Sequence, residues 1–147
     1  MSPDAGYSGT PLARKLGIKP GSRVAIVHAP VGFMIAGTDG ASIDTTVRTQ
    51  SPSYDVVVLF CVDSTTAQRD FARHAGVLVD NGGLWVAWPK RASGVPTDLD
   101  DAVVRALGLD GGLVDVKVCA IDATWSGLKF VRRLADRPPK VRPGGQT

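Results

Sequence analysis

The chain has 147 residues, of which 44% are hydrophobic and 21% are charged. This length predicts a single domain with one hydrophobic core, and no apolar run approaches the roughly 18 residues that are needed to span a membrane. The formal net charge of +3 comes from residues 132–147, where five basic side chains accompany one aspartate, so the remaining chain has no basic excess and a nucleic-acid interface is not expected.

The beginning of the chain predicts a mobile segment followed by a helix and a strand. Residues 1–9 are small and polar, as mobile termini are. Thr10 and Pro11 then supply a helix cap and a proline suited to the first helical position, so a short helix is expected through about Leu16. Arg23–His28 is a β-branched run typical of a buried strand. No basic region precedes an apolar core here, so we expect a cytoplasmic protein.

The segment from residue 29 to residue 54 has the weakest pattern, because glycines and a proline interrupt its apolar residues. We expect a short helix near Gly32–Ala36. A short strand is expected near Ile43–Arg48. The structure of this segment as a whole cannot be derived from its sequence.

The middle of the chain predicts a strand, a helix and a second strand. Asp55–Cys61 is a strong buried strand. Asp63 offers a cap for a helix that continues to about Val79. Asn81–Gly83 predicts a turn, which leads into the apolar strand Leu84–Trp88.

The last third predicts a helix and a hairpin. Pro96–Asp98 caps a helix that Gly108 is expected to close. Leu113–Ile121 alternates apolar and polar residues, and Trp125–Val131 returns beside it as the second strand of a hairpin. Residues 134–147, rich in proline, glycine and arginine, predict a disordered basic tail.

Strands that alternate with helices and end in a hairpin are typical of an α/β fold. We therefore expect residues 10–133 to form a single Rossmann-like domain. Its sheet should be mostly parallel, flanked by helices, and completed by an antiparallel hairpin.

This order of elements, with Ile18–Val24 leading into the first strand, resembles the carboxyl half of the Rossmann-like methyltransferase fold. The resemblance implies a glycine-rich turn after the first strand that approaches S-adenosylmethionine, and an acid after the second strand that binds the ribose. Here the turn is Ala29–Phe33, in which Pro30 offers no N–H, and only Asp39 and Asp44 lie near the second position. We therefore expect a degenerate site that binds no cofactor.

A second resemblance rests on four segments: Gly6–Leu12, Gly83–Lys90, Val116–Asp122 and Trp125–Phe130. Through them, residues 6–133 resemble a family of small bacterial proteins known only as domain of unknown function 3052. This resemblance implies no activity, cofactor or catalytic residue.

Two cationic residues, Lys90 and Arg91, follow the strand Leu84–Trp88 and should therefore lie at the carboxyl edge of the expected sheet. They could hold a carboxylate or phosphate, or they could form only a solvated loop. The turn that holds Trp125 and Ser126 should lie at the same edge, because the carboxyl ends of parallel strands meet there. Trp125 could stack on a ligand at this edge or pack into the core.

His28 ends the first strand and Asp63 follows its neighbour, so the two could form a base and its orienting carboxylate. The sequence favours the simpler alternative, in which His28 hydrogen-bonds a neighbouring loop. The two cysteines lie in separate apolar runs, which predicts neither a disulfide framework nor a metal site.

Two functions remain open at this point. The first is a non-catalytic domain that binds a small anionic ligand or a protein partner, as the altered cofactor turn suggests. The alternative is a divergent, transferase-like enzyme that uses His28, Asp63 and Lys90 at the carboxyl edge. Nucleic acid is not an expected partner, and neither is a membrane.

Overall fold

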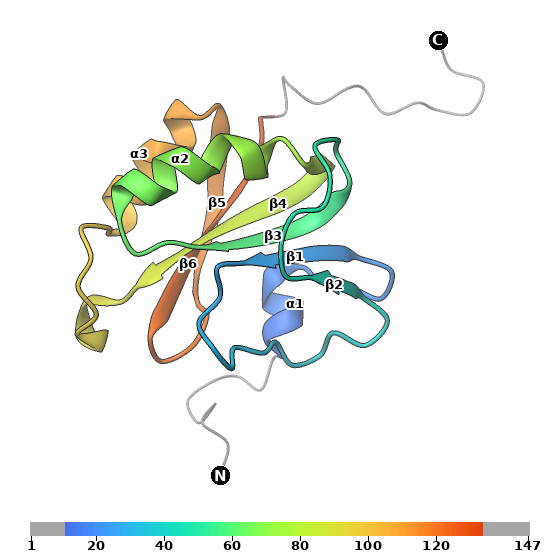
Figure 1. Cartoon of the computed structure of the whole chain (residues 1–147), viewed down its shortest axis with the longest axis horizontal. Coiled ribbons are helices and arrows are strands. Elements are labelled where there is room, and N and C mark those ends of the chain that lie inside the picture. The colour runs from blue at the N-terminus through green and yellow to red at the C-terminus, as the bar shows by residue number, and fades with distance from the viewer. Residues whose placement is uncertain (1–10, 134–147) are drawn as a thin grey trace.

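The computed structural model describes residues 11–133, which form one sheet with helices on both faces (Figure 1). The helices are α1 (Leu12–Leu16), α2 (Ser64–Ala75) and α3 (Asp101–Asp110), with the 3₁₀ helix η1 (Arg91–Ser93). The strands are β1 (Arg23–Val27), β2 (Ser42–Asp44), β3 (Tyr54–Phe60), β4 (Leu78–Pro89), β5 (Leu113–Ala120) and β6 (Trp125–Arg132).

The strands lie in the order β2-β1-β3-β4-β6-β5. β2, β1, β3 and β4 are parallel, whereas β6 pairs antiparallel with both β4 and β5. Helices α2 and α3 cover one face of the sheet and α1 lies on the other (Figure 1). The predicted fold class, a mostly parallel Rossmann-like sheet that ends in an antiparallel hairpin, is therefore confirmed.

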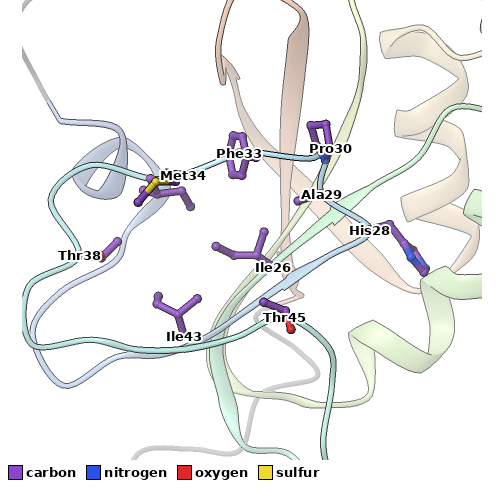
Figure 2. A pocket seen from close by; sticks show the side chains of 10 residues that line it. Ile26, His28, Ala29, Pro30, Phe33, Met34, Thr38, Ile43 and Thr45 are labelled. Carbon is purple, nitrogen blue, oxygen red and sulfur yellow. The ribbon is translucent and has the colours of Figure 1, made fainter.

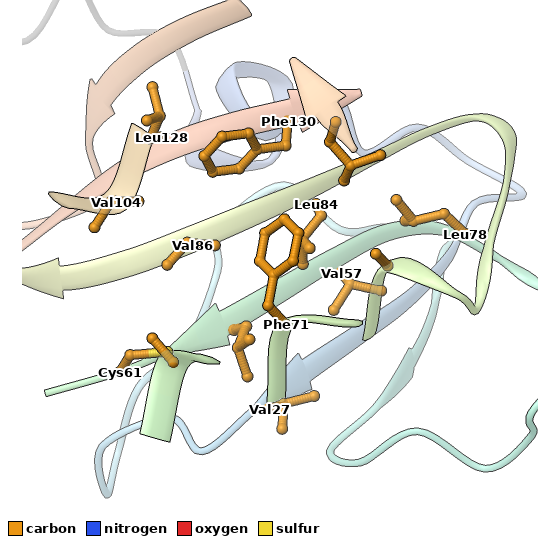
Figure 3. Close-up of a cluster of buried hydrophobic side chains, with 14 of the residues drawn as sticks. Val27, Val57, Cys61, Phe71, Leu78, Leu84, Val86, Val104, Leu128 and Phe130 are labelled. Carbon is orange, nitrogen blue, oxygen red and sulfur yellow. The ribbon is translucent and has the colours of Figure 1, made fainter. Parts of the chain in front are cut away.

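Helix α3 lies close to the sheet because Gly108 within the helix and Gly111 at its C-cap leave room for aromatic rings. Phe71 of α2 and Phe130 of β6 meet edge to face, with ring centroids 5.6 Å apart (Figure 3). A Cβ on Gly108 would lie 1.9 Å from Cε1 of Phe130, and one on Gly111 would lie 2.5 Å from Cε2 of Phe71. The helix predicted to close at Gly108 therefore continues through it.

The opposite face of the sheet is anchored by a tryptophan. Trp85 of β4 is fully buried, and its indole N–H donates to the carbonyl of Leu16 at the end of α1 over 3.0 Å. This bond satisfies the polar end of a ring that is otherwise packed among apolar side chains. Trp88 points to the other face, as the alternation of side chains along a strand requires.

The helix predicted at Gly32–Ala36 is wrong, because residues 29–41 form irregular structure. Gly32 and Gly37 have φ values of 82° and 88°, in the left-handed region, which a right-handed helix does not use. These residues bracket the segment and prevent a helix. Strand β2 is also shorter than predicted.

The turn predicted at Asn81–Gly83 is wrong as well, because these residues continue β4, and α2 ends before the predicted Val79. The pairing of β3 with β4 shifts register between Tyr54 and Val56. Glycines inside a strand often mark such a bulge, because they allow a close approach of backbone. Here they bend a long strand without ending it.

Two predictions concern residues outside the described range, namely the mobile segment 1–9 and the disordered tail 134–147. Within residues 11–133, no helix combines the length and the apolar character that crossing a bilayer would need.

Candidate functional site

The carboxyl edge of the sheet holds three neighbouring pockets. After β1 the chain moves to β2 on one side, whereas β3 and β4 lie on the other, so the sheet reverses its winding between β1 and β3. Ligands of open α/β sheets bind at such a reversal, outside the carboxyl ends of the strands. This edge is therefore the candidate site.

The first pocket, which we call the β1–β2 pocket, has a volume of about 520 Å³ and a mainly apolar lining. Ile26 lies between Phe33 and Ile43, Thr38 closes one end, and His28 lies at the other end (Figure 2). Met34 lies at the mouth with 84% of its surface exposed. The lining suits a ligand with a large apolar portion.

His28 stands where β1 ends, in a strained backbone conformation. Its φ of 60° makes it the one residue other than glycine with a positive φ within residues 11–133. Left-handed backbone costs an L-residue roughly 1–2 kcal/mol, and such strain persists where the surrounding structure holds it. The imidazole is directed toward α2, away from the other residues of the pocket (Figure 2).

The partner of His28 is Asp70 of α2. Nε2 of His28 lies 3.3 Å from Oδ2 of Asp70, and the two side chains are 53% and 11% exposed, respectively. Arg69 also holds this carboxylate, through Nε at 2.9 Å and Nη2 at 3.0 Å. Hydrogen bonding from Arg69 is the main cause that lowers the pKa of Asp70, against the opposing effect of burial. The carboxylate is therefore ionised, and the imidazole remains open to solvent on its other side.

The predicted pairing of His28 with Asp63 is wrong. Asp63 caps α2 instead: its carboxylate accepts the backbone N–H of Thr66 over 2.7 Å, and this bond lowers the pKa of Asp63. A capping aspartate has its acceptor occupied by the helix end. The carboxylate that lies beside His28 is instead that of Asp70, two helical turns further along α2.

A smaller pocket of about 190 Å³ occupies the reversal point itself, between His28, Cys61, Arg69 and Trp125. Trp125 is only 8% exposed and meets Phe60 edge to face at 5.0 Å. Packing is thus its main role, although one edge of the ring reaches the pocket. Burial raises the pKa of the Cys61 thiol to about 12, so this thiol is no nucleophile at neutral pH.

The third pocket, about 640 Å³, brings together Lys90, Arg91 and Ser126. The backbone N–H of Lys90 donates to the carbonyl of Thr124 over 2.8 Å, and Pro89 of β4 pairs with Trp125 of β6. The predicted closeness of Lys90, Arg91 and the Trp125 turn is therefore confirmed. Asp100 and Asp101, at the start of α3, line the same pocket and give it both signs of charge.

Replacement of Lys90 and Arg91 together by Ala is expected to leave the thermal melt almost unchanged. Neither side chain forms an ion pair with another residue of the range 11–133, and substitutions of this kind usually change stability by less than about 0.5 kcal/mol. Differential scanning calorimetry of both proteins measures the effect. Loss of the cooperative transition would show that the pair is structural.

The acid at the end of β2, Asp44, does not face the β1–β2 pocket. Ile43 and Thr45 line that pocket, whereas the carboxylate of Asp44 accepts the hydroxyl of Tyr54 over 2.5 Å and lies 3.5 Å from Nη2 of Arg23. The hydrogen bond from Tyr54 is the main cause that lowers the pKa of Asp44. This carboxylate is engaged within the fold and is not presented to a ligand.

The sequence analysis did not identify Asp70 as a site residue, and it assigned to Asp63 a role beside His28 that Asp63 does not have. One feature of the sequence pointed to Asp70: it is a charged residue next to Phe71, on the apolar side of α2, and one turn before His74. The buried His74 imidazole contacts the Asp70 carbonyl at 2.7 Å, and burial lowers the pKa of that imidazole. Within residues 11–133, no group of three or more metal-ligating side chains comes together.

Comparison with known proteins identifies the fold but no family. No family model matches the chain, and no curated protein matches its sequence. Its structure is similar to a SAM-dependent methyltransferase from Aquifex aeolicus (TM-score 0.60, 12% identity, 88% of each chain covered). It is also similar to a TehB-like SAM-dependent methyltransferase from Corynebacterium glutamicum (TM-score 0.59, 10% identity, 88% of this chain and 91% of that chain).

A third similar structure is the magnesium protoporphyrin IX methyltransferase of Synechocystis PCC 6803 with bound SAM. It gives a TM-score of 0.57 at 14% identity over 83% of this chain and 74% of that chain. At these identities the likeness concerns architecture. The chain has the Rossmann-like fold of SAM-dependent methyltransferases.

Proposed function

We propose that this chain is a divergent, transferase-like enzyme whose site lies at the carboxyl edge of the sheet. One observation carries the proposal: the strained, exposed His28, backed by the ionised Asp70, stands between the β1–β2 pocket and the pocket at the reversal point. The similar solved structures are methyltransferases, which supports an enzyme more than a passive module.

His28 has the geometry of a general base. With the ring proton on Nε2, on the side that faces the Asp70 carboxylate at 3.3 Å, the other ring nitrogen, Nδ1, carries the lone pair that accepts a proton. Asp70 then fixes the tautomer and stabilises the imidazolium that forms. A hydroxyl or amine of a bound ligand would give its proton to Nδ1 as that oxygen or nitrogen becomes the nucleophile.

The proposed ligand has an apolar body and an anionic group. Its body would occupy the β1–β2 pocket, where the lining is mainly apolar. Lys90 and Arg91, further along the same edge, would bind a carboxylate or phosphate. S-adenosylmethionine fits this arrangement poorly, because Pro30 offers no N–H and Asp44 is held by Tyr54 and Arg23.

A second candidate is the non-catalytic module that binds a small ligand or a protein partner. The observation that favours it is the same altered turn, since Phe33 and Pro30 place side chains where a glycine-rich turn would leave space. We further propose, from the four segments described above, that the chain belongs to the bacterial family known as domain of unknown function 3052.

A ligand screen followed by product analysis tests the proposal. Thermal shift should identify a stabilising compound among nucleosides, aromatic acids and their phosphates, because a ligand at 100 times its dissociation constant stabilises by about 2.7 kcal/mol. Mass spectrometry of the incubated compound, with candidate group donors present, should then reveal turnover by the native protein and none by His28→Gln. Binding without turnover would favour the non-catalytic module.

S-adenosylmethionine is the most informative single compound in that screen. Isothermal titration is expected to give no saturable isotherm in the micromolar range, because neither the turn after β1 nor Asp44 offers the required contacts. S-adenosylhomocysteine, which lacks the transferred methyl group and the sulfonium charge, is titrated as a second probe of the same site. A saturable isotherm for either compound would overturn this expectation and make the chain a methyltransferase candidate.

A further inference from the structure

Three lysines gather on the sheet face that also carries α1, away from the carboxyl edge. Lys117 of β5 and Lys129 of β6 are directly opposite each other in the antiparallel pair, so their side chains leave the same face. Lys19, in the loop after α1, also acts on the ammonium group of Lys129. We call these three residues the lysine cluster. Lys129 lies four residues along β6 from Trp125, or about 13 Å at strand spacing.

The fold makes room for Lys129 at this position. A Cβ on Gly83, in the neighbouring strand β4, would lie 2.6 Å from Cε of Lys129. A Cβ on Gly17 would lie 3.6 Å from Nζ. The aliphatic stem of Lys129 therefore runs across Gly83, and its ammonium lies half-buried beside the end of α1.

The cluster has no compensating carboxylate among the described residues. None of its three side chains forms a hydrogen bond or an ion pair with a residue of the range 11–133. Burial, followed by the charges of Lys117 and Lys19, lowers the pKa of Lys129. Like charges directly opposite each other in a sheet are destabilising, and so is a desolvated ammonium without a partner.

An anion held between these ammonium groups would offset both costs at once. Lysine binds phosphate as a compact point charge, and three lysines match an anion that carries two or more negative charges. A singly charged ion would leave most of the repulsion in place. The arrangement therefore selects a multiply charged group over chloride.

We propose that the lysine cluster is a binding site for a phosphate-type anion, separate from the pockets of the carboxyl edge. Pyrophosphate is the probe, and sodium chloride at equal ionic strength is the reference, because surface charges respond to salt in general. Isothermal titration and thermal shift of the full chain should detect pyrophosphate binding beyond the effect of chloride.

Matched variants locate the site. Lys129→Met keeps the apolar stem and removes the charge, so it should weaken pyrophosphate binding at least tenfold and raise the melting temperature without ligand. Lys117→Met should also weaken binding, and its exposed side chain makes it safe for folding if Lys129→Met disturbs the core. Arg73→Gln removes one exposed positive charge from α2, on the other face of the sheet, and should leave binding unchanged.

The same titrations can overturn the proposal. Pyrophosphate that stabilises no more than chloride would exclude a specific site. Binding that survives Lys129→Met and Lys117→Met but is lost in the Lys90→Ala and Arg91→Ala double variant would place the anion at the carboxyl edge. An equal loss in Arg73→Gln would show that binding follows net charge and not the lysine cluster.

Discussion

Replacement of Phe130 by Ala is expected to lower the free energy of unfolding by about 3–5 kcal/mol, the usual cost of deleting a buried aromatic ring. Phe130 is fully buried, contacts Phe71 edge to face, and fills the space beneath α3 (Figure 3). Equilibrium urea unfolding measures the loss as a lower midpoint at an unchanged slope. Met34→Ala is the control, because Met34 is 84% exposed and its loss should cost less than about 0.5 kcal/mol.

Gly108 provides the sharper test of the same packing. In the native protein, Gly108→Ala forces a methyl group to within 1.9 Å of Cε1 of Phe130, and overpacking of this kind costs about 1–3 kcal/mol. In the Phe130→Ala background the obstacle is gone. Alanine should then stabilise α3 by up to about 1 kcal/mol through its helix propensity. A change that has the same sign in both backgrounds would contradict the close approach of α3 to the ring.

The architecture could be predicted from local patterns, because a buried strand or a hairpin has a recognisable pattern within a few consecutive residues. Within the predicted strand Asp55–Cys61, residues 56–61 form a continuous apolar run, and the structure places β3 over nearly the same residues. The hairpin after Leu113 was equally clear, since its two strands are adjacent in sequence. Each of these elements depends on side chains that its own segment contains.

Elements could not be predicted where a glycine makes room for a residue that is distant in the sequence. Gly108 looks like a helix end, but it lies inside α3 because Phe130, 22 residues later, requires the space. Asn81–Gly83 looks like a turn, but its glycines allow β4 to continue past a register shift with β3. In both cases the tertiary contact decides, and nothing in the local sequence reveals it.

The candidate site divides in the same way. Lys90 and the Trp125 turn were placed together correctly, because strand order alone brings them to one edge. The predicted partner of His28 is wrong, because the sequence does not show which of the two carboxylates, Asp63 or Asp70, caps the start of α2 and is therefore occupied. Asp63 is bonded to Thr66, so Asp70 remains for the imidazole.

The backbone at His28 leads to the second large effect. His28→Gly should be more stable than His28→Ala by about 1–2 kcal/mol, since both lose the imidazole but only glycine adopts a φ of 60° without strain. Urea unfolding of the two variants measures the difference. Ala29→Gly is the matched control: its backbone has no positive φ, so glycine there should destabilise by about 0.4–1 kcal/mol through the entropy of the unfolded chain.

Equal stability of His28→Gly and His28→Ala would mean that the left-handed conformation is relaxed in solution. The expected difference has a functional meaning, because glycine would satisfy this turn at lower cost than histidine does. A chain that keeps histidine there accepts strain in order to hold an imidazole beside Asp70, between the two pockets. His28→Gly should therefore remain folded and lose turnover of any compound that the native protein converts. If His28→Gly kept full turnover, His28 could not be the general base.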